Sequence, residues 1–586
     1  MRAFEQQFPS EIESVLALLA TCPPRPDRLE LWLSGPREVR ARLQTDLRHR
    51  FPGCELRVHA AYKPLACEVL EVHLPLWRAA PPRHVHLRFP VLDGAHPERF
   101  LIEAYPLAGW LDDLRVRFTH ESHAADHYEL VVDGEVTRVE VPLRGATDAL
   151  GRPCLRPTAR VDSLEGEGAT TRLVLTDAER CWDAYTAFLK GFPWPQQAPF
   201  FGVLRIAAEL SEPDEPLAYG HERASLTEGL SEDLYFGTLE YFQDRAGVPP
   251  GSRELPVGQI VPVVKAVPGG PCRLTVDLLP LPQAVASSGG APPLSTLDRP
   301  LRVAEVHHLT REWPDLPAFH SVQGRPIPTL RRPGRGPGVL ISGGQHGNEA
   351  TGVAAALWAA GQLASPLPLG FIPLENPDGA ALFEELRAVA PEHMHHAARY
   401  TALGDDLEYR WPPFGEADAR CALARELNAA LHVNLHGYPA HEWTRPFSGY
   451  VPRGFEAWSL PKGFVLLVRH TPEQSEQARR LAERVCLDLS GLRALMAFNQ
   501  RQLRVYERHT AARPYRMLHG TPVMLAEVEG RLCPLTLLTE FPDETVEGEL
   551  FRLGCTAQGQ VIESAVRWLE GETLSSPRPA LNNARK

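Results

Sequence analysis

Short apolar runs that stop at glycine, proline or a polar turn recur through the second half of the chain. Val339–Ser342 reads as a buried strand and stops at the pair Gly343-Gly344, where the turn is too tight for a side chain. Ala354–Leu363, rich in Ala, Leu and Gln, predicts a helix, and Gly370–Leu374 predicts the next strand. This order of strand, turn and helix is typical of open α/β sheets, which place their sites at the carboxyl ends of strands.

The first half of the chain has a different pattern, with more strand than helix. Alternating residues on both sides of Asp133-Gly134 predict a hairpin, since this pair suits a type I′ turn. Leu29–Leu33 and His84–Phe89 predict further short strands. Ser231–Arg245 predicts an amphipathic helix with Ser231 as its N-cap and Gly247 just past its end. We therefore expect a β-rich α+β N-terminal half.

One segment separates the two halves. Gln283–Pro300 is rich in Ser, Gly and Pro and reads as a linker, because such a composition buries little apolar area. The expected organisation is an N-terminal α+β accessory domain at 1–155, a second accessory region at 156–282 that is β-rich with a helix, the linker at 283–300, a catalytic domain at 301–574 and a disordered tail at 575–586.

Composition excludes several classes of function. The chain has 586 residues, of which 44% are hydrophobic and 23% charged, so material for buried cores is ample. Its formal net charge of -12 argues against nucleic-acid binding and against an anionic membrane surface. The start lacks a signal-peptide pattern, and no apolar run is long enough to span a bilayer. The ten cysteines include no Cys-x-x-Cys pair and read as thiols in a reducing compartment, so we expect a cytoplasmic protein.

The turn after the first buried strand carries the candidate chemistry. His346 and Glu349 lie three residues apart there, and an imidazole with a carboxylate makes half of a catalytic zinc site. Downstream, His436 follows the apolar run Leu431–Val433, and Glu540 ends a β-type run just before a proline. The pair alone is a weak signal, but the later strand-end His and Glu make a zinc hydrolase the leading hypothesis.

This order of motifs resembles the zinc metallocarboxypeptidase family, the carboxypeptidase A-like funnelins. Ser321–Ile327 is similar to the family's Ser-x-x-Gly-Arg-x-Ile hairpin, and Asn376–Gly379 matches its Asn-Pro-Asp-Gly turn. The four motifs together cover about residues 317–545. The segment around His346 is also similar to the aspartoacylase and succinylglutamate desuccinylase relatives, which cleave an acyl–amino acid amide. The resemblance implies a mixed sheet with helices on both faces at 301–574.

The resemblance also implies roles. One Zn²⁺ per chain is expected on His346, Glu349 and His436, with His432 and His441 as rival third ligands. Glu540 corresponds to the family's general base, with Glu527 and Glu529 as rivals. Tyr438 completes the family's His-x-Tyr pattern, and Tyr515 is a possible counterpart of its mobile tyrosine. Asn434 stands where many members carry Asp.

The family's carboxylate-binding segment is altered here. Aligned on Asp406, Glu408 replaces the family's Asn and Tyr409 replaces its Arg. A substrate carboxylate beside Glu408 would be repelled unless a guanidinium intervenes. Arg410, Arg399 and Arg387 are the available replacements, and one of them is also expected to polarise the scissile carbonyl. His393, His395 and His396 are candidates to line the cleft.

The expected activity follows from these assignments. It is zinc-dependent hydrolysis of a peptide bond by a metallocarboxypeptidase. An N-acyl amino acid deacylase is the alternative with the same chemistry, and a catalytically silent binding protein is the third. The expected partner is accordingly a peptide or acyl–amino acid substrate, and the oligomeric state stays open.

Overall fold

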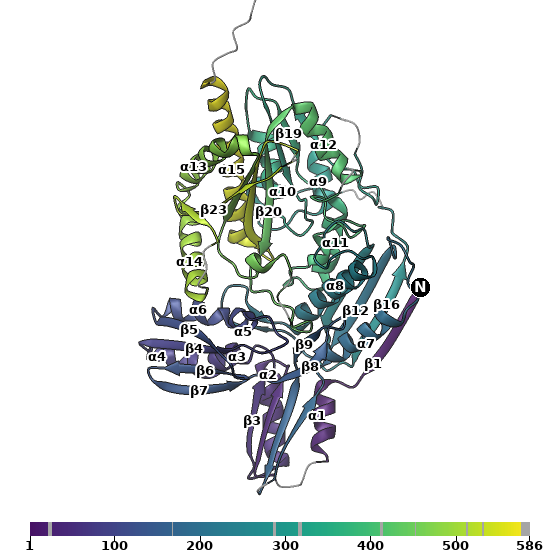
Figure 1. Ribbon diagram of the computed structural model, residues 1–586, viewed down its shortest axis with the longest axis vertical. Helices are drawn as coiled ribbons and strands as arrows, with labels where there is room; N and C mark the ends of the chain where they lie inside the picture. The colour runs from purple at the N-terminus through teal and green to yellow at the C-terminus, as the bar shows by residue number, and fades with distance from the viewer. Residues whose placement is uncertain are drawn as a thin grey trace, which may run out of the picture.

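The computed structural model describes residues 1–21, 26–166, 168–284, 289–314, 319–410, 414–449, 451, 453–510, 514–529 and 532–575. The two halves of the sequence form two regions that meet along a broad junction (Figure 1). None of the described helices combines the length and the apolar composition that a membrane span requires.

The C-terminal half is built on one mixed sheet. In spatial order its eight strands are β17 (Leu330–Arg332), β19 (Leu369–Ile372), β18 (Gly338–Gly343), β20 (Ala429–Pro439), β24 (Leu535–Glu544), β21 (Val465–His470), β23 (Thr521–Glu527) and β22 (Arg516–Leu518). The central strands β19, β18, β20 and β24 run parallel, whereas β21 is antiparallel to β24. The carboxyl ends of β18, β20 and β24 therefore meet at one edge.

Helices cover both faces of this sheet, as predicted. On one face α10 (Thr351–Gln362), α13 (Ser475–Leu489) and α15 (Gly548–Ser575) share a core with Val339 and Ile341. Leu340, between those two residues, packs on the other face with α12 (Glu416–Leu427). The alternation of neighbouring residues between two apolar layers is what a strand buried on both faces requires. The same half also contains α9 (Val303–Thr310), α11 (Pro377–Val389) and α14 (Arg493–His509).

Two of the predicted motifs are bonded to each other. Asp378 accepts hydrogen bonds from the Ser321 hydroxyl (2.6 Å), the Gln323 amide (2.9 Å) and the Arg325 guanidinium (2.7 Å). Asn376 caps α11 by accepting from the Gly379 amide at 2.8 Å. The hairpin and the Asn-Pro-Asp-Gly turn thus form one rigid unit beneath the strand ends.

The N-terminal half contains three four-stranded sheets and a two-stranded ribbon. The strands are β1 (Arg2–Phe8), β16 (Cys272–Leu279), β12 (Val203–Leu210) and β15 (Gln259–Ala266) in the first sheet; β11 (Gly168–Val174), β10 (Ala159–Glu165), β2 (Arg28–Leu33) and β3 (Glu55–Ala60) in the second; β5 (Arg117–His123), β4 (His84–Pro90), β6 (His127–Val132) and β7 (Glu135–Glu140) in the third; and β8 (Leu143–Thr147) with β9 (Pro153–Pro157) in the ribbon. A minor pair joins β13 (Glu215–Pro216) to β14 (Arg223–Ala224). The region is β-rich, as its pattern predicted.

Helices pack against these sheets. They are α1 (Glu11–Leu19), α2 (Arg37–Arg50), α3 (Pro64–Glu68), α4 (Leu74–Ala79), α5 (Arg99–Glu103), α6 (Tyr105–Asp113), α7 (Asp177–Gly191) and α8 (Leu226–Arg245). The hairpin β6–β7 turns through Asp133 (φ 48°) and Gly134 (φ 99°), so the predicted type I′ geometry is present. Strands from both sides of residue 155 share sheets, since β1 pairs with β16 and β2 with β10.

The predicted helix at Ser231–Arg245 differs from the observed one. Helix α8 starts five residues earlier, at Leu226, and its N-cap is Ser225, whose hydroxyl accepts from the Glu228 backbone amide at 3.0 Å. Ser231 is itself buried inside the helix. The helix is buried on nearly all sides because it lies between the two halves, so the amphipathic pattern misplaced its start.

Part of the predicted linker is packed. Leu297 is buried with Ala350 and Phe551, and the Gly548 amide donates to the Asp298 carbonyl at 2.7 Å. Residues 285–288 of the linker and residues 576–586 of the predicted tail lie outside the described residues.

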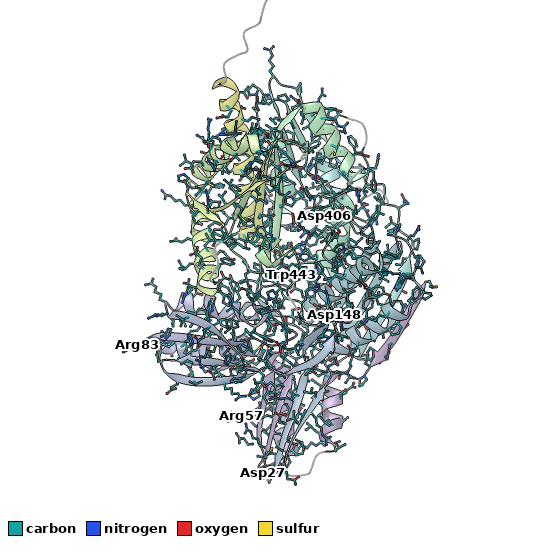
Figure 2. The ribbon with its side chains drawn as sticks, viewed as in Figure 1. Asp27, Arg57, Arg83, Asp148, Asp406 and Trp443 are labelled. Atoms are coloured by element: carbon teal, nitrogen blue, oxygen red, sulfur yellow. The ribbon has the colours of Figure 1, made fainter. Side chains whose placement is uncertain are left out.

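Buried charges hold the junction between the halves together. His441 lies 2.9 Å from Glu228 of α8, and Arg445 donates to Asp233 (3.2 Å) and Glu240 (2.9 Å) of the same helix. These basic residues belong to the segment that follows strand β20, which contains His436. Figure 2 marks Trp443 of this segment at the junction, where it packs against Phe236 of α8 with ring centroids 5.6 Å apart. The N-terminal half therefore fixes the path of the chain beyond β20.

A second buried pair crosses the same junction. The Lys63 ammonium bonds Glu442, and the side chains of the two residues are 5% and 0% exposed. Burial lowers the pKa of Lys63, but Glu442 and neighbouring anions raise it more, so the ammonium stays charged.

We expect Lys63→Met to lower the free energy of unfolding by about 3–5 kcal/mol, because it leaves the Glu442 carboxylate buried without its partner. The matched control is Arg57→Met, which breaks an ion pair with Glu55 whose side chains are 60% and 56% exposed and should change stability by less than about 1 kcal/mol. Urea unfolding of both variants measures the difference. Equal losses would contradict a stabilising role for the buried pair.

Candidate active site

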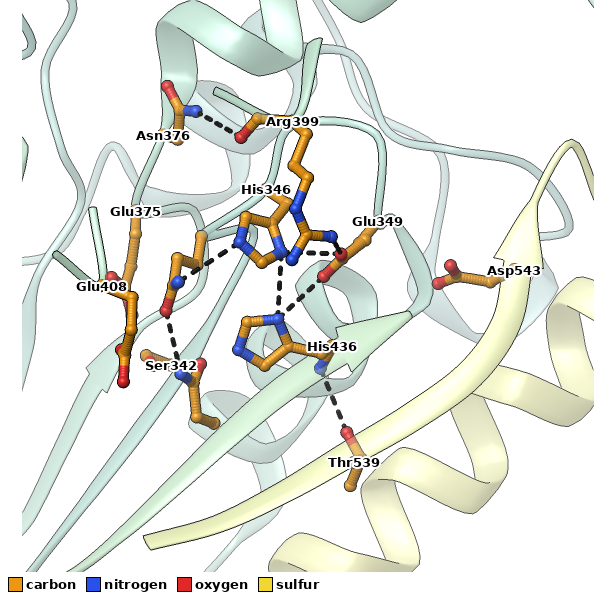
Figure 3. Close-up of polar contacts among 12 residues, drawn as sticks. Ser342, His346, Glu349, Glu375, Asn376, Arg399, Glu408, His436, Thr539 and Asp543 are labelled. Atoms are coloured by element: carbon orange, nitrogen blue, oxygen red, sulfur yellow. Dashed lines mark hydrogen bonds and ion pairs between the residues drawn. The ribbon is translucent and has the colours of Figure 1, made fainter. Parts of the chain in front are cut away.

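Three predicted side chains meet at the carboxyl edge of the C-terminal sheet. His346 and Glu349 lie in the turn between β18 and α10, and His436 lies near the end of β20. The Nδ1 atoms of the two histidines are 3.1 Å apart, and each faces one oxygen of Glu349, at 2.6 Å for His346 and 3.0 Å for His436 (Figure 3). All three side chains are almost fully buried.

This arrangement fits a zinc ion. Zinc binds imidazole nitrogen and carboxylate oxygen at about 2.0–2.2 Å, so two ligand atoms on one tetrahedral ion lie roughly 3.3 Å apart. The observed separations of 2.6–3.1 Å are close to that value, and the three donor atoms point at one another from three directions. Two histidines and a glutamate are also a donor set that catalytic zinc uses with one position left open.

The local glycines make this turn possible. Gly344 has a φ of 59°, in the left-handed region, and a Cβ on Gly347 would lie 2.1 Å from the backbone carbon of Gly379. The turn that carries His346 therefore packs directly on the Asn-Pro-Asp-Gly turn, and this close approach fixes its position.

Glu349 is held as an anion. Burial alone raises the pKa of this carboxyl, but His346, His436 and the Arg399 guanidinium lower it further than burial raises it, so its pKa lies well below the usual value. Arg399 Nη1 donates to Glu349 at 2.8 Å, and the Arg399 backbone is tied to Asn376. The sequence placed Arg399 among its candidates, and the structure puts it beside the cluster.

Asp406 orients the ring of His346 from behind. Its carboxylate lies 3.6 Å from His346 Nε2, on the side of the ring away from Glu349. Burial raises the pKa of Asp406, but the contact with His346 and the nearby Arg399 lower it more, so it is ionised. An anion behind a ligand ring fixes the ring and makes its other nitrogen a better donor. Asn434 does not take this place, because its side chain bonds Ser342 and Gln345.

A pocket of about 730 Å³, including its mouth, opens next to the cluster. Its walls contain cations, anions and aromatic rings from both halves of the chain. The lining residues are Arg253, Gln345, His346, His396, Arg399, Asp406, Glu408, Tyr409, His436, Gly437, Tyr438, Pro439, Gly454, Phe455, Trp458, Leu467, Arg469, Leu538 and Glu540.

Glu540 lies in this pocket directly across from His436. The two residues are partners in the parallel pairing of β20 with β24, so their side chains leave the same face of the sheet. Burial, followed by the charge of Glu349, raises the pKa of Glu540 well above its usual value. Its rivals Glu527 and Glu529 are exposed and do not line the pocket. Only Glu540 of the three is placed to act at the cluster.

Arg410 and Tyr515, which the sequence proposed for the site, are not brought to it. The Arg410 guanidinium is buried between Asp405 (2.7 Å) and Glu416 (2.6 Å), so it stabilises the loop and is closed to a substrate. The Tyr515 hydroxyl contacts Glu507 at 3.4 Å, and its ring packs near Tyr506. Arg387, the remaining alternative, faces Glu547 at the surface. Among the candidate arginines, only Arg399 reaches the pocket.

The other predicted substrate residues line the pocket with altered roles. Tyr409 is 42% exposed at its mouth. Glu408 is neutralised by Arg469 (2.7 Å) and Arg420 (3.2 Å), so the predicted repulsion of a carboxylate is offset. The Tyr438 hydroxyl is engaged by the Gly463 carbonyl at 2.7 Å, which leaves its ring to form the wall.

The rival histidines are accounted for by other contacts. His432 bonds the Ser342 hydroxyl at 2.7 Å, and His441 faces Glu228 of α8. Of the three candidates to line the cleft, His396 does so, stacked on Trp443 with ring centroids 4.0 Å apart. His393 and His395 point instead to Thr227 and to the Ala390 carbonyl.

Three basic residues in or beside the pocket were missed by the sequence reasoning. Arg253 comes from the N-terminal half and Arg469 from β21. Lys462 is buried behind the pocket with its ammonium 4.6 Å from the centre of the Trp458 ring, and burial lowers its pKa to about 7. None lies in a recognisable motif, and only the strand position of Arg469, just before Thr471-Pro472, was a visible signal.

Residues 295–425 match the model of the zinc carboxypeptidase family. The resemblance inferred from the motifs is thus confirmed over a segment that includes His346 and Glu349 but ends before His436 and Glu540. No curated protein matches the chain.

The solved structures that match this chain share little sequence identity with it. Thrombin activatable fibrinolysis inhibitor is 9% identical, with 46% of this chain and 74% of that one covered and a TM-score of 0.28. A succinylglutamate desuccinylase/aspartoacylase from Rhodobacter sphaeroides is 15% identical, with 42% and 58% covered and a TM-score of 0.24. A succinylglutamate desuccinylase from Chromobacterium violaceum is 16% identical, with 47% and 74% covered and a TM-score of 0.23. Similarities this low do not decide between the activities named.

We expect the purified protein to bind one zinc per chain and His346→Ala to bind none, because this change removes one of only three donors. His519→Ala is the control, since that histidine is at the surface beside Glu483. Metal analysis of the dialysed proteins measures both. A full equivalent of zinc in the His346→Ala protein would refute the assigned site.

Asp406→Asn should weaken zinc binding by about 10- to 100-fold while the fold is retained, since the amide keeps the size of the side chain but not its charge. Titration against a competing chelator gives the affinity. Asp418→Asn, in the first turn of α12, should leave it unchanged. Unaltered affinity in Asp406→Asn would show that the contact with His346 is incidental.

Proposed function

We propose that this chain is a zinc-dependent metallocarboxypeptidase, which hydrolyses the peptide bond of a C-terminal residue. One observation carries the proposal: Glu540 lines the same pocket as His346 and His436 and is the register partner of His436 on the neighbouring strand. Hydrolysis of an amide by activated water requires a metal site and a carboxylate base in one pocket.

His346, Glu349 and His436 would hold the zinc ion. Bound there, zinc supplies Lewis-acid chemistry, which polarises a carbonyl and makes water a nucleophile near neutral pH. The remaining work is assigned to side chains of this chain.

Glu540 is the proposed general base and acid. Its carboxylate takes a proton from the attacking water while the new C–O bond forms at the scissile carbonyl carbon. The same carboxyl then gives that proton to the leaving nitrogen as the C–N bond breaks, so the products are a carboxylate and an amine.

Arg399 is the proposed partner of the carbonyl oxygen. Its Nη1 atom bonds Glu349, whereas its Nε atom is buried with no hydrogen-bond partner among the described residues. A buried donor without an acceptor is costly. An oxygen that gains negative charge during the reaction would satisfy it, and a fixed donor aimed at developing charge accelerates acyl transfer.

The pocket walls suit a peptide residue. Phe455, Trp458 and Leu467 provide apolar surface, and the guanidinium groups provide positive charge. An N-acyl amino acid also combines an amide with a carboxylate, so deacylation is the competing outcome. Zinc-loaded protein incubated with mixed peptides and N-acyl amino acids, with the products identified by mass, decides between them. Release of only acyl groups would overturn the carboxypeptidase assignment.

We expect Glu540→Gln to keep its zinc but to lose at least about 10²-fold in kcat, the usual contribution of a positioned base. The control is Glu527→Gln, because Glu527 ends a strand of the same sheet but is exposed outside the pocket. Turnover is measured at equal zinc content. If Glu527→Gln loses the activity and Glu540→Gln keeps it, the general base has been assigned to the wrong strand.

A further inference from the structure

Arg253 is a residue of the N-terminal half that lies in the candidate active site. It follows α8 in the segment before β15, and its side chain lines the pocket beside Arg399. Its guanidinium is 4.4 Å from the centre of the Phe455 ring, and that of Arg399 is 5.3 Å from the same ring. Two cations from different halves of the chain thus meet at one aromatic side chain.

Most of the hydrogen-bonding capacity of Arg253 is unused. A guanidinium has five N–H donors. Nη2 donates to the Gly454 carbonyl at 3.1 Å, and the nearest carboxylate, Asp406, is 3.9 Å from Nη1, too far for a hydrogen bond. No acceptor among the described residues lies within hydrogen-bonding distance of Nε or Nη1. The side chain is 20% exposed and lines the pocket.

The third arginine of the pocket, Arg469, is in the opposite situation. Arg469 donates to Glu408 at 2.7 Å, and Glu408 also bonds Arg420, which in turn bonds Glu375 at 2.8 Å. The positive charges of two guanidinium groups and the negative charges of two carboxylates cancel on this side of the pocket. An anion placed there would compete with anions already bonded, so the charge that is available for a substrate lies on the side of Arg253.

We propose that Arg253 binds the C-terminal carboxylate of the substrate, so that the N-terminal half supplies the anchor that the altered motif at Glu408 and Tyr409 lacks. This rests on the proposed function, because it assumes a substrate with a free terminal carboxylate. The planar guanidinium matches a carboxylate with two parallel hydrogen bonds. Asp406 links the anchor to the cluster, 3.9 Å from Arg253 and 3.6 Å from His346.

The backbone around Arg253 is fixed without its side chain. The Asp406 amide donates to the Arg253 carbonyl at 2.9 Å, and the Gly258 amide donates to the Leu403 carbonyl at 2.8 Å. A Cβ on Gly404 would lie 2.4 Å from the Gly258 oxygen, so the two segments touch. Arg253→Ala therefore removes the guanidinium and keeps the segment in place.

The test uses the full-length, zinc-loaded protein and two peptides of identical sequence, one with a free and one with an amidated C-terminus. Binding is measured by calorimetry in the Glu540→Gln background, which prevents turnover. Adding Arg253→Ala should weaken binding of the free-carboxylate peptide on the order of 10- to 100-fold, the effect of a lost charged hydrogen bond, and change that of the amidated peptide by less than about 3-fold. Arg253→Lys should restore part of the loss.

Arg469→Ala combined with Glu408→Ala is the matched control, because it removes both partners of an ion pair in the same pocket and leaves neither charge uncovered. Its effect should be the same for both peptides. Equal weakening of both peptides by Arg253→Ala would show that Arg253 has a merely structural role and would overturn the proposal. No weakening, or no binding of either peptide before the change, would overturn it as well. A loss specific for the free-carboxylate peptide in the control would move the anchor to Arg469.

Failure of the proposed function gives a different result. If the protein with Glu540 intact cleaves neither peptide, yet the free-carboxylate peptide binds in an Arg253-dependent way, the anchor stands and the carboxypeptidase assignment falls. If it cleaves peptides and Arg253→Ala leaves their KM unchanged, the assignment stands and the anchor falls.

Discussion

The architecture depends on the need to neutralise the carboxylates buried on helix α8. Glu228, Asp233 and Glu240 are removed from water on a helix that has almost no exposed side. Buried anions are tolerated only with charged or hydrogen-bonding partners. Those partners, His441 and Arg445, come from the segment after the metal-site strand β20. Because Glu228 and Asp233 take their basic partners from the other half, the two halves are joined in one arrangement, and this arrangement shapes the pocket.

The same constraint links the junction to the chemistry. The segment that carries Arg445 continues to Phe455, and the helix that carries Glu232 contacts the backbone of His396, close to Arg399. Two walls of the pocket are thus shaped by contacts with the N-terminal half, whereas His346, Glu349 and Glu540 depend on the sheet edge. The site combines a metal-binding floor, which the C-terminal sheet provides, with walls that the junction positions.

The residues of the metal-binding floor could be predicted from the sequence, whereas several residues of the walls could not. His346, Glu349 and His436 could be found because their positions follow from local strand–turn geometry and a family pattern. Arg253 could not, since it meets Arg399 only through a contact between segments far apart in the chain. Arg410 was misassigned because it is one residue from Tyr409 in sequence, while the turn directs its side chain to Asp405 and Glu416. The start of α8 was missed because its first turns are buried between the two regions on nearly all sides, so no amphipathic pattern marks where the helix begins.

The order of translation gives the junction a further consequence. The ribosome completes α8 long before it reaches Arg445, by about 10–40 s at the usual 5–20 residues per second. During that interval Asp233 and Glu240 lack the arginine that they bond in the finished protein. Trp443, which packs against Phe236 of α8, is also synthesised after the strand that carries His436. The junction and the metal site thus both require residues that leave the ribosome in the same late part of synthesis.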